Sequence, residues 1–208
     1  ENPIMYSKPD YSTFKINDMD ILIAVYSPNG THTAEAIAPA MKTMMTAQKN
    51  FLGKFNSTKK YSVLIYLSDM QNENDAHGFG ALEHPTATTV VMPEMMGIDE
   101  LNEQLKDVVS HEFFHIVTPL TIHSNEIQNF DYIAPKMSEH LWMYEGVTEY
   151  FANLFQVNQG LISEDDYCTR IAGKISNANG MNDTMPFTKM SANVLKKPYK
   201  DQYLNVYE

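Results

Sequence analysis

Cysteine, long apolar runs and basic residues are scarce in this chain of 208 residues. A single cysteine, Cys168, excludes an internal disulfide. No apolar run approaches the roughly 18 residues that a membrane-spanning helix needs, so we expect no membrane insertion. Only 15 Lys and Arg face 26 Asp and Glu, a net charge of -11. This charge disfavours nucleic acid as a partner and favours cationic ligands, such as a peptide with a free amino end.

The order of apolar patterns predicts a mixed α/β first half followed by helices. Residues 61–67 and 86–92 have the β-branched and aromatic content of strands, and residues 16–26 indicate a strand or a hairpin. A helix is expected between residues 26 and 61, with Pro39 in its first turn. From Ile98 onward helical patterns dominate. The sequence therefore predicts an α+β chain with an N-lobe at 1–97 and a helical lobe at 98–208.

The most informative stretch is His111-Glu112-Phe113-Phe114-His115. On a helix, residues four apart share a face, so His111 and His115 can bind one metal ion together. Glu112 projects to the side of that face, where it can serve as a base for a water molecule instead of as a ligand. The spacing is that of a zinc hydrolase.

The surroundings of this motif indicate a buried helix. Its apolar residues begin behind Asp99, a candidate N-cap, and the pattern stops at Pro119. The alternative is a core helix whose histidines bond to backbone carbonyls. Two histidines and a glutamate are costly to bury without a partner, which favours the metal site.

A third ligand is expected from a second helix. The metzincin pattern requires Gly and His where this chain has Thr118 and Thr121, so that class is excluded. The segment 141–151 offers Glu145 and Glu149, four apart on one helical face. We predict Glu145 as the ligand. Glu149 is expected to accept a hydrogen bond from a zinc-bound histidine, with a solvated surface carboxylate as the alternative.

The motif and the segment Leu141-Trp142-Met143-Tyr144-Glu145-Gly146-Val147-Thr148-Glu149 together resemble the glycyl aminopeptidase family of bacterial zinc peptidases, within the gluzincin group. The resemblance implies a thermolysin-like catalytic domain with a bound Zn²⁺, a peptide substrate and a preference for small amino-terminal residues. It also implies a longer parent chain with an N-terminal β-domain, C-terminal helices and, in many members, a PDZ module. The compartment stays open, with a periplasmic or secreted location slightly favoured over a cytoplasmic one.

Two further segments acquire roles from this resemblance. Gly80-Ala81-Leu82-Glu83-His84 is similar to a substrate-binding edge strand, in which the backbone of Gly80 and Ala81 pairs with the peptide and Glu83 binds its α-amine. An ordinary strand glutamate is the alternative for Glu83. Tyr207 matches a tyrosine that donates to the oxyanion, and the family pattern is expected to continue beyond Glu208, which makes this chain a fragment truncated at its C-terminus.

The resulting prediction is a zinc-dependent aminopeptidase in which His111, His115 and Glu145 bind the metal and Glu112 is the base. Two alternatives stay open. The same site can belong to an endopeptidase, in which case Glu83 is incidental, or the chain can be a zinc-stabilised peptide-binding module without turnover.

Overall fold

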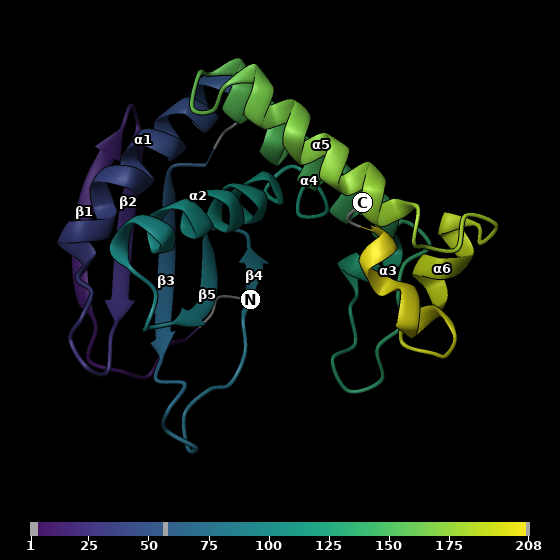
Figure 1. Cartoon of the computed structure of the whole chain (residues 1–208), viewed down its shortest axis with the longest axis horizontal. Helices are drawn as coiled ribbons and strands as arrows, with labels where there is room; N and C mark the ends of the chain where they lie inside the picture. The colour runs from purple at the N-terminus through teal and green to yellow at the C-terminus, as the bar shows by residue number, and fades with distance from the viewer. Residues whose placement is uncertain (1–3, 56–57, 207–208) are drawn as a thin grey trace. The chain divides into compact units, whose positions relative to one another are not determined.

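A computed structural model of the chain describes residues 4–55 and 58–206, and it divides into two compact units, one up to Ile116 and one from Val117 onward (Figure 1). The first unit is built on a five-stranded sheet whose order is β1, β2, β3, β5, β4. The strands are β1 (Asp10–Ile16), β2 (Met19–Tyr26), β3 (Lys60–Ser68), β4 (Gly80–His84) and β5 (Ala87–Pro93). The predicted α+β class is confirmed.

Strand direction changes at both edges of the sheet. Strands β2, β3 and β5 are parallel, whereas β1 pairs antiparallel with β2 and β4 pairs antiparallel with β5. Asn17, with a φ of 53°, turns the chain between β1 and β2, in a conformation that asparagine tolerates better than most residues. Because β4 stands last in the order, its outer edge has no strand beside it within the described residues.

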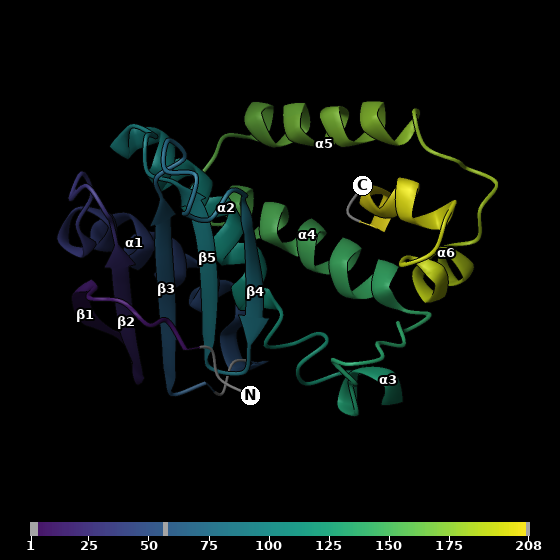
Figure 2. The ribbon, with the colours of Figure 1, turned by 90° about the horizontal axis from the view of Figure 1, so that it is seen from below.

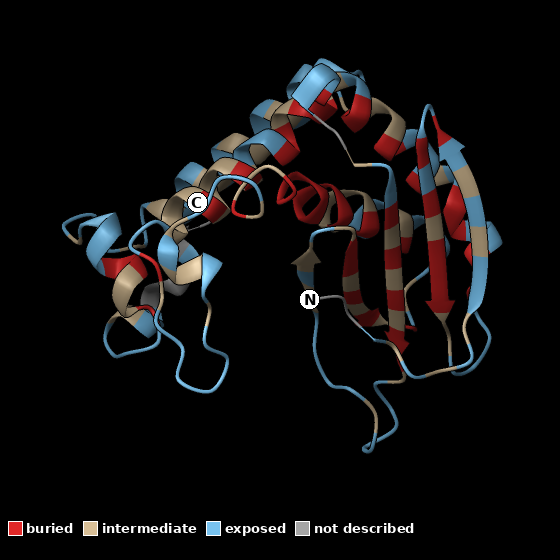
Figure 3. Ribbon diagram, turned by 180° about the vertical axis from the view of Figure 1, so that it is seen from behind, coloured by how far each residue is buried: buried red, intermediate tan, exposed pale blue. Residues whose placement is uncertain are grey.

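Both long helices of this unit lie on one face of the sheet (Figure 2). Helix α1 (Ala34–Leu52) connects β2 to β3, and α2 (Ile98–Phe114) follows β5. The two helices contact each other, and α2 also contacts β4 and β5. Inward-facing residues alternate along β3, where Tyr61, Val63, Ile65 and Leu67 are fully buried, and buried and less buried positions alternate along the strands in Figure 3.

Two helix boundaries differ from the sequence prediction. Pro39 is the sixth residue of α1, not a first-turn residue, because Thr33 caps the helix and accepts a hydrogen bond from the Ala36 N–H. Helix α2 begins after Gly97, so Asp99 lies in the first turn instead of at the N-cap. A carboxylate there still suits the positive end of the helix dipole.

The second unit is helical. It contains α3 (Asn125–Gln128), α4 (Leu141–Asn158), α5 (Glu164–Ala178), α6 (Phe187–Asn193) and the 3₁₀ segment η2 (Tyr199–Val206). Helix α4 contacts α5, α6 and η2. Ser163 and Asp166 form a capping box at the start of α5, a start that the sequence predicts.

The division between the compact units falls after α2, whereas the sequence predicts an N-lobe that ends at residue 97. The difference is α2, which packs on α1, β4 and β5 and therefore belongs with the sheet. Consequently the His-Glu-Phe-Phe-His motif lies in the β-rich unit. In the part of the chain that the structure describes, no helix has the length and apolarity to cross a membrane.

One ion-pair cluster in the first unit has a clear pH dependence. Lys49, a nearly buried residue of α1, lies 3.4 Å from Asp18, which also pairs with Lys59. Hydrogen bonds from Lys59 and Lys49 lower the pKa of Asp18 from 3.8 to about 2. A carboxylate whose pKa is lowered by folding stabilises the fold above its unfolded pKa, and this contribution disappears as the pH falls through the folded value.

We expect Asp18→Asn to lower the urea midpoint at pH 6 and to have a diminishing effect as the pH falls from about 4 to about 2. Urea unfolding of both proteins across this range measures the difference. As a control, 1 M NaCl should reduce the effect at pH 6 because salt screens the exposed pair. A pH-independent difference would contradict the assignment.

Candidate zinc centre

The two histidines of the motif lie at the end of α2. The His115 N–H bonds to the carbonyls of Glu112 and Phe113, so the helix tightens there into a 3₁₀-type turn. The chain nevertheless keeps a helical conformation at His115, with φ −61° and ψ −16°. The imidazole rings of His111 and His115 lie with their centroids 4.8 Å apart at an interplanar angle of 78°, as expected for residues on one helical face.

Both histidines and the glutamate between them are buried. The exposed fractions are 9% for His111, 7% for Glu112 and 2% for His115. Buried ionisable side chains are rare unless they are paired or bind a metal. Imidazole is a preferred zinc ligand, and two of them on one face supply half of a tetrahedral set. The donor chemistry and the burial therefore fit Zn²⁺.

Glu83 joins this group from the edge strand. One carboxylate oxygen each of Glu83 and Glu112 and one ring nitrogen of His115 all lie within 4.8 Å of one another. The sheet register explains how: Glu83 pairs with Thr88 of β5, which pairs with the buried Val63 of β3, so the Glu83 side chain projects from the face that α2 covers. The structure thus brings together two predicted site residues from β4 and α2.

Tyr61 is a part of this neighbourhood that sequence reasoning missed. Its side chain is fully buried, and its ring meets that of Phe113 edge to face, with centroids 4.8 Å apart. Burial raises the pKa of Tyr61 well above 10, and the negative charges of Glu112 and Glu83 raise this pKa further. The strand pattern at 61–67 places Tyr61 on the helix-facing side, but only the strand pairing shows that this side faces Glu83.

Gly80 and Ala81 border a groove along β4. This groove has a volume of about 610 Å³, and it is lined in part by Phe79, Gly80, Ala81 and Leu82. Phe79 also borders a second groove, of about 590 Å³. In the first groove the lining residues Leu82, Thr89 and Val91 alternate with Glu83 and Thr88, so this groove lies on the sheet face opposite to the one that α2 covers. Substrate pairing at Gly80 and Ala81 stays a prediction.

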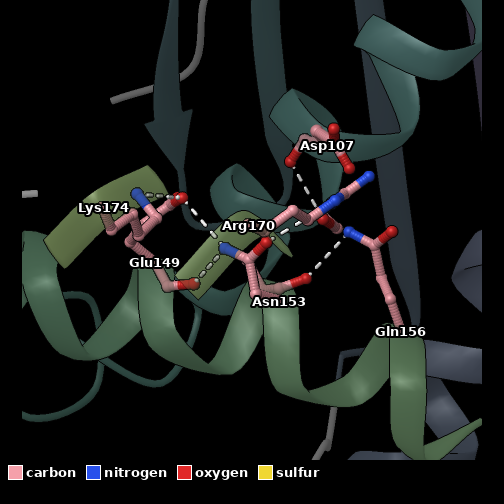
Figure 4. Close-up of polar contacts among 8 residues, drawn as sticks. Asp107, Glu149, Asn153, Gln156, Arg170 and Lys174 are labelled. Atoms are coloured by element: carbon pink, nitrogen blue, oxygen red, sulfur yellow. Dashed lines mark hydrogen bonds and ion pairs between the residues drawn. The ribbon is translucent and has the colours of Figure 1, made fainter. Parts of the chain in front are cut away.

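The other two predicted carboxylates lie in the second unit, on α4. Glu145 is partly exposed and one turn before Glu149. Glu149 forms an ion pair with Lys174 of α5 at 2.9 Å and accepts a hydrogen bond from Asn153 at 3.0 Å, and Arg170 donates to the same asparagine (Figure 4). Glu149 is therefore part of a polar network between α4 and α5, which differs from a solvated surface carboxylate.

The roles of three predicted site residues, Glu145, Glu149 and Tyr207, stay predictions. Because Glu145 belongs to the second unit and the histidines to the first, the complete ligand set is a proposal. The hydrogen bond predicted between Glu149 and a zinc-bound histidine crosses the same boundary and stays a prediction. Tyr207 lies outside the residues that the structure describes.

Comparison with solved structures defines the class of fold. An aminopeptidase N family protein from Idiomarina loihiensis matches 93% of the chain with a TM-score of 0.70 at 18% identity. An M1 zinc metallopeptidase from Deinococcus radiodurans matches 87% with a TM-score of 0.48 at 13% identity. The chain covers 33% and 34% of these two structures, about one third of their length. The fold is that of the aminopeptidase N family structure.

The family model of the M61 glycyl aminopeptidases matches residues 104–207, which include the motif and α4. The chain belongs to the M61 glycyl aminopeptidase family. No curated protein matches the sequence. The resemblance inferred from His111 to His115 and from Glu145 to Glu149 is therefore confirmed at the level of the family.

The ligand assignment predicts different effects for the two carboxylates of α4. Each of the single variants Glu145→Ala, His111→Ala and His115→Ala should abolish tight zinc binding. Glu149→Ala should weaken zinc binding by about 10–100-fold, the usual effect of losing a group that orients a ligand. Zinc titration against a chelator of known affinity measures both. Lys174→Ala is the matched control, because it disturbs the same network without removing a carboxylate. Zinc retained by Glu145→Ala and lost by Glu149→Ala would reverse the two roles.

Proposed function

We propose that this chain is the catalytic part of a zinc-dependent aminopeptidase that hydrolyses peptide bonds at the free amino end of peptides. The observation that carries the proposal is the cluster of Glu83, Glu112 and His115, whose donor atoms lie within 4.8 Å of one another. A metal ligand and a base would suffice for any zinc peptidase. The additional carboxylate beside them favours a substrate with a positive charge next to the bond that is cleaved.

In this proposal His111, His115 and Glu145 hold the zinc ion. Zinc bound there would supply a water molecule that is acidic enough to react near neutral pH and would polarise the scissile carbonyl. Membership in the M61 family supports this assignment.

Glu112 acts as the general base and then as the general acid. Its carboxylate takes the proton of the attacking water and transfers it to the leaving nitrogen as the peptide bond breaks. The Glu112 side chain is only 7% exposed, so its carboxylate is largely shielded from bulk water. A charged group interacts more strongly with its neighbours in such a shielded environment than in water. Tyr207 is proposed, from the family resemblance alone, to donate a hydrogen bond to the developing oxyanion.

Glu83 fixes which peptide bond reaches Glu112. An ammonium group bound by Glu83 lies within one residue of the bond that is cleaved, which makes the enzyme an exopeptidase. The outer edge of β4 offers the backbone groups of Gly80 and Ala81 to the extended substrate. The preference for a small first residue is proposed from the family resemblance.

Removal of the base should separate zinc binding from catalysis. We expect Glu112→Gln to keep its zinc, since this residue is not a ligand, and to lose about 10²–10⁴-fold in kcat, the range for a lost general base. Metal analysis and turnover of a free-amine dipeptide measure the two properties on the same sample. Loss of zinc from the variant would overturn the assignment.

Removal of the amine anchor should change specificity. Glu83→Gln should lower kcat/KM on a free-amine peptide by about 10–100-fold, the equivalent of one charged hydrogen bond, and leave any activity on the acetylated peptide unchanged. Asp99→Asn, a carboxylate lost from the first turn of α2, is the charge-matched control.

The same pair of substrates separates the alternatives. Equal cleavage of free-amine and acetylated peptides by the unaltered protein would show an endopeptidase, and zinc binding without turnover of either would show a binding module.

A further inference from the structure

Tyr61 buries a polar hydroxyl group at a core position where a phenylalanine would avoid the cost of burying that group. The residue is 0% exposed, and its hydroxyl oxygen has no hydrogen-bond partner among the described residues. A buried polar group without a partner destabilises a fold, so such a group in a native protein requires a reason beyond packing.

The position of Tyr61 supplies that reason. In the sheet, Tyr61 precedes Val63 on the face that is covered by the helices, and its ring lies against Phe113, the residue after Glu112. The two carboxylates whose charge acts on the phenol are Glu112 and Glu83, and the effect of Glu112 is the larger. The buried phenol O–H is a hydrogen-bond donor without an acceptor among the described residues, so it is available to an acceptor that moves within reach.

We propose that Tyr61 is a positioning residue for the base: its hydroxyl donates a hydrogen bond to the Glu112 carboxylate in the zinc-loaded protein. This inference depends on the proposed function, in which Glu112 moves a proton between water and the leaving nitrogen. A carboxylate in that role works only when it is held in one orientation. A hydroxyl at its side restricts rotation of the carboxylate and touches neither the substrate nor the metal.

Tyr66 provides a matched control on the same strand. It lies on the opposite face of β3, and its hydroxyl bonds to Asp75 at 2.5 Å. This bond raises the pKa of Tyr66 to about 12. Tyr61→Phe and Tyr66→Phe therefore each remove a hydroxyl group from β3. In Tyr61→Phe this is the hydroxyl proposed to position the base, and in Tyr66→Phe it is the hydroxyl that bonds to Asp75.

The two variants should show opposite patterns. In the zinc-free protein, Tyr61→Phe should unfold at the same urea concentration as the unaltered protein or at a higher one. In the zinc-loaded protein it should keep its zinc and its KM and lose about tenfold or more in kcat, with the 10²–10⁴-fold for the base itself as the upper bound. Tyr66→Phe should unfold at a lower urea concentration and keep its kcat. If Tyr61→Phe lowers stability and leaves kcat unchanged, Tyr61 is a packing residue and the inference fails.

A spectroscopic measurement decides the inference independently of turnover. In zinc-loaded protein labelled with ¹³C at the tyrosine Cζ, the Tyr61 signal, assigned by its loss in Tyr61→Phe, should move on Glu112→Gln by more than on Glu83→Gln. An equal or smaller movement on Glu112→Gln overturns the inference. If the unaltered protein turns over no free-amine peptide, the proposed function fails. The carbon signal still shows in that case whether the Tyr61 hydroxyl is hydrogen-bonded to Glu112.

Discussion

The proximity of the carboxylates of Glu83 and Glu112 is the constraint on which the candidate site depends. Donor atoms of these two residues lie within 4.8 Å of each other, and Glu112 is almost completely buried. Two like charges at this distance in a partly dry environment are unfavourable unless positive charge compensates them. In the proposed function, a zinc ion held by the neighbouring histidines would provide one such charge, and the ammonium group of a peptide would provide a second. The arrangement would then be most favourable with metal and substrate both bound.

The packing of α2 on the sheet creates this proximity. Glu112 comes from the last turn of α2, and Glu83 comes from β4, which α2 contacts. Along β3, β5 and β4 the alternation of side chains places every second residue beneath the helix. Loss of this packing would separate the carboxylates and the histidine together, so the stability of the first unit and the chemistry of the site depend on the same contacts.

Local patterns in the sequence predict the elements and part of the site. Short-range rules, which relate residues within about one helical turn, correctly predict the shared helical face of His111 and His115. They also predict the capping residues at the start of α5. The proximity of Glu83 to Glu112 depends on β4 pairing antiparallel with β5, and the network of Glu149 depends on Lys174 from the next helix. These are long-range pairings, which residue spacing does not encode. Tyr61, some 50 positions before Glu112, is part of the site for the same reason.

The shortness of the edge strand gives a physical reason for the charge anchor in the proposed function. Strand β4 has five residues, so an added peptide can form few backbone hydrogen bonds with it. The strength of backbone pairing also depends little on which residues are paired, so a peptide can shift along the strand with little loss of binding free energy. A carboxylate that binds only the terminal ammonium removes this freedom, because a single register satisfies both the ion pair and the backbone bonds. In the proposed function, the strand would determine the direction of the substrate and Glu83 would determine its register.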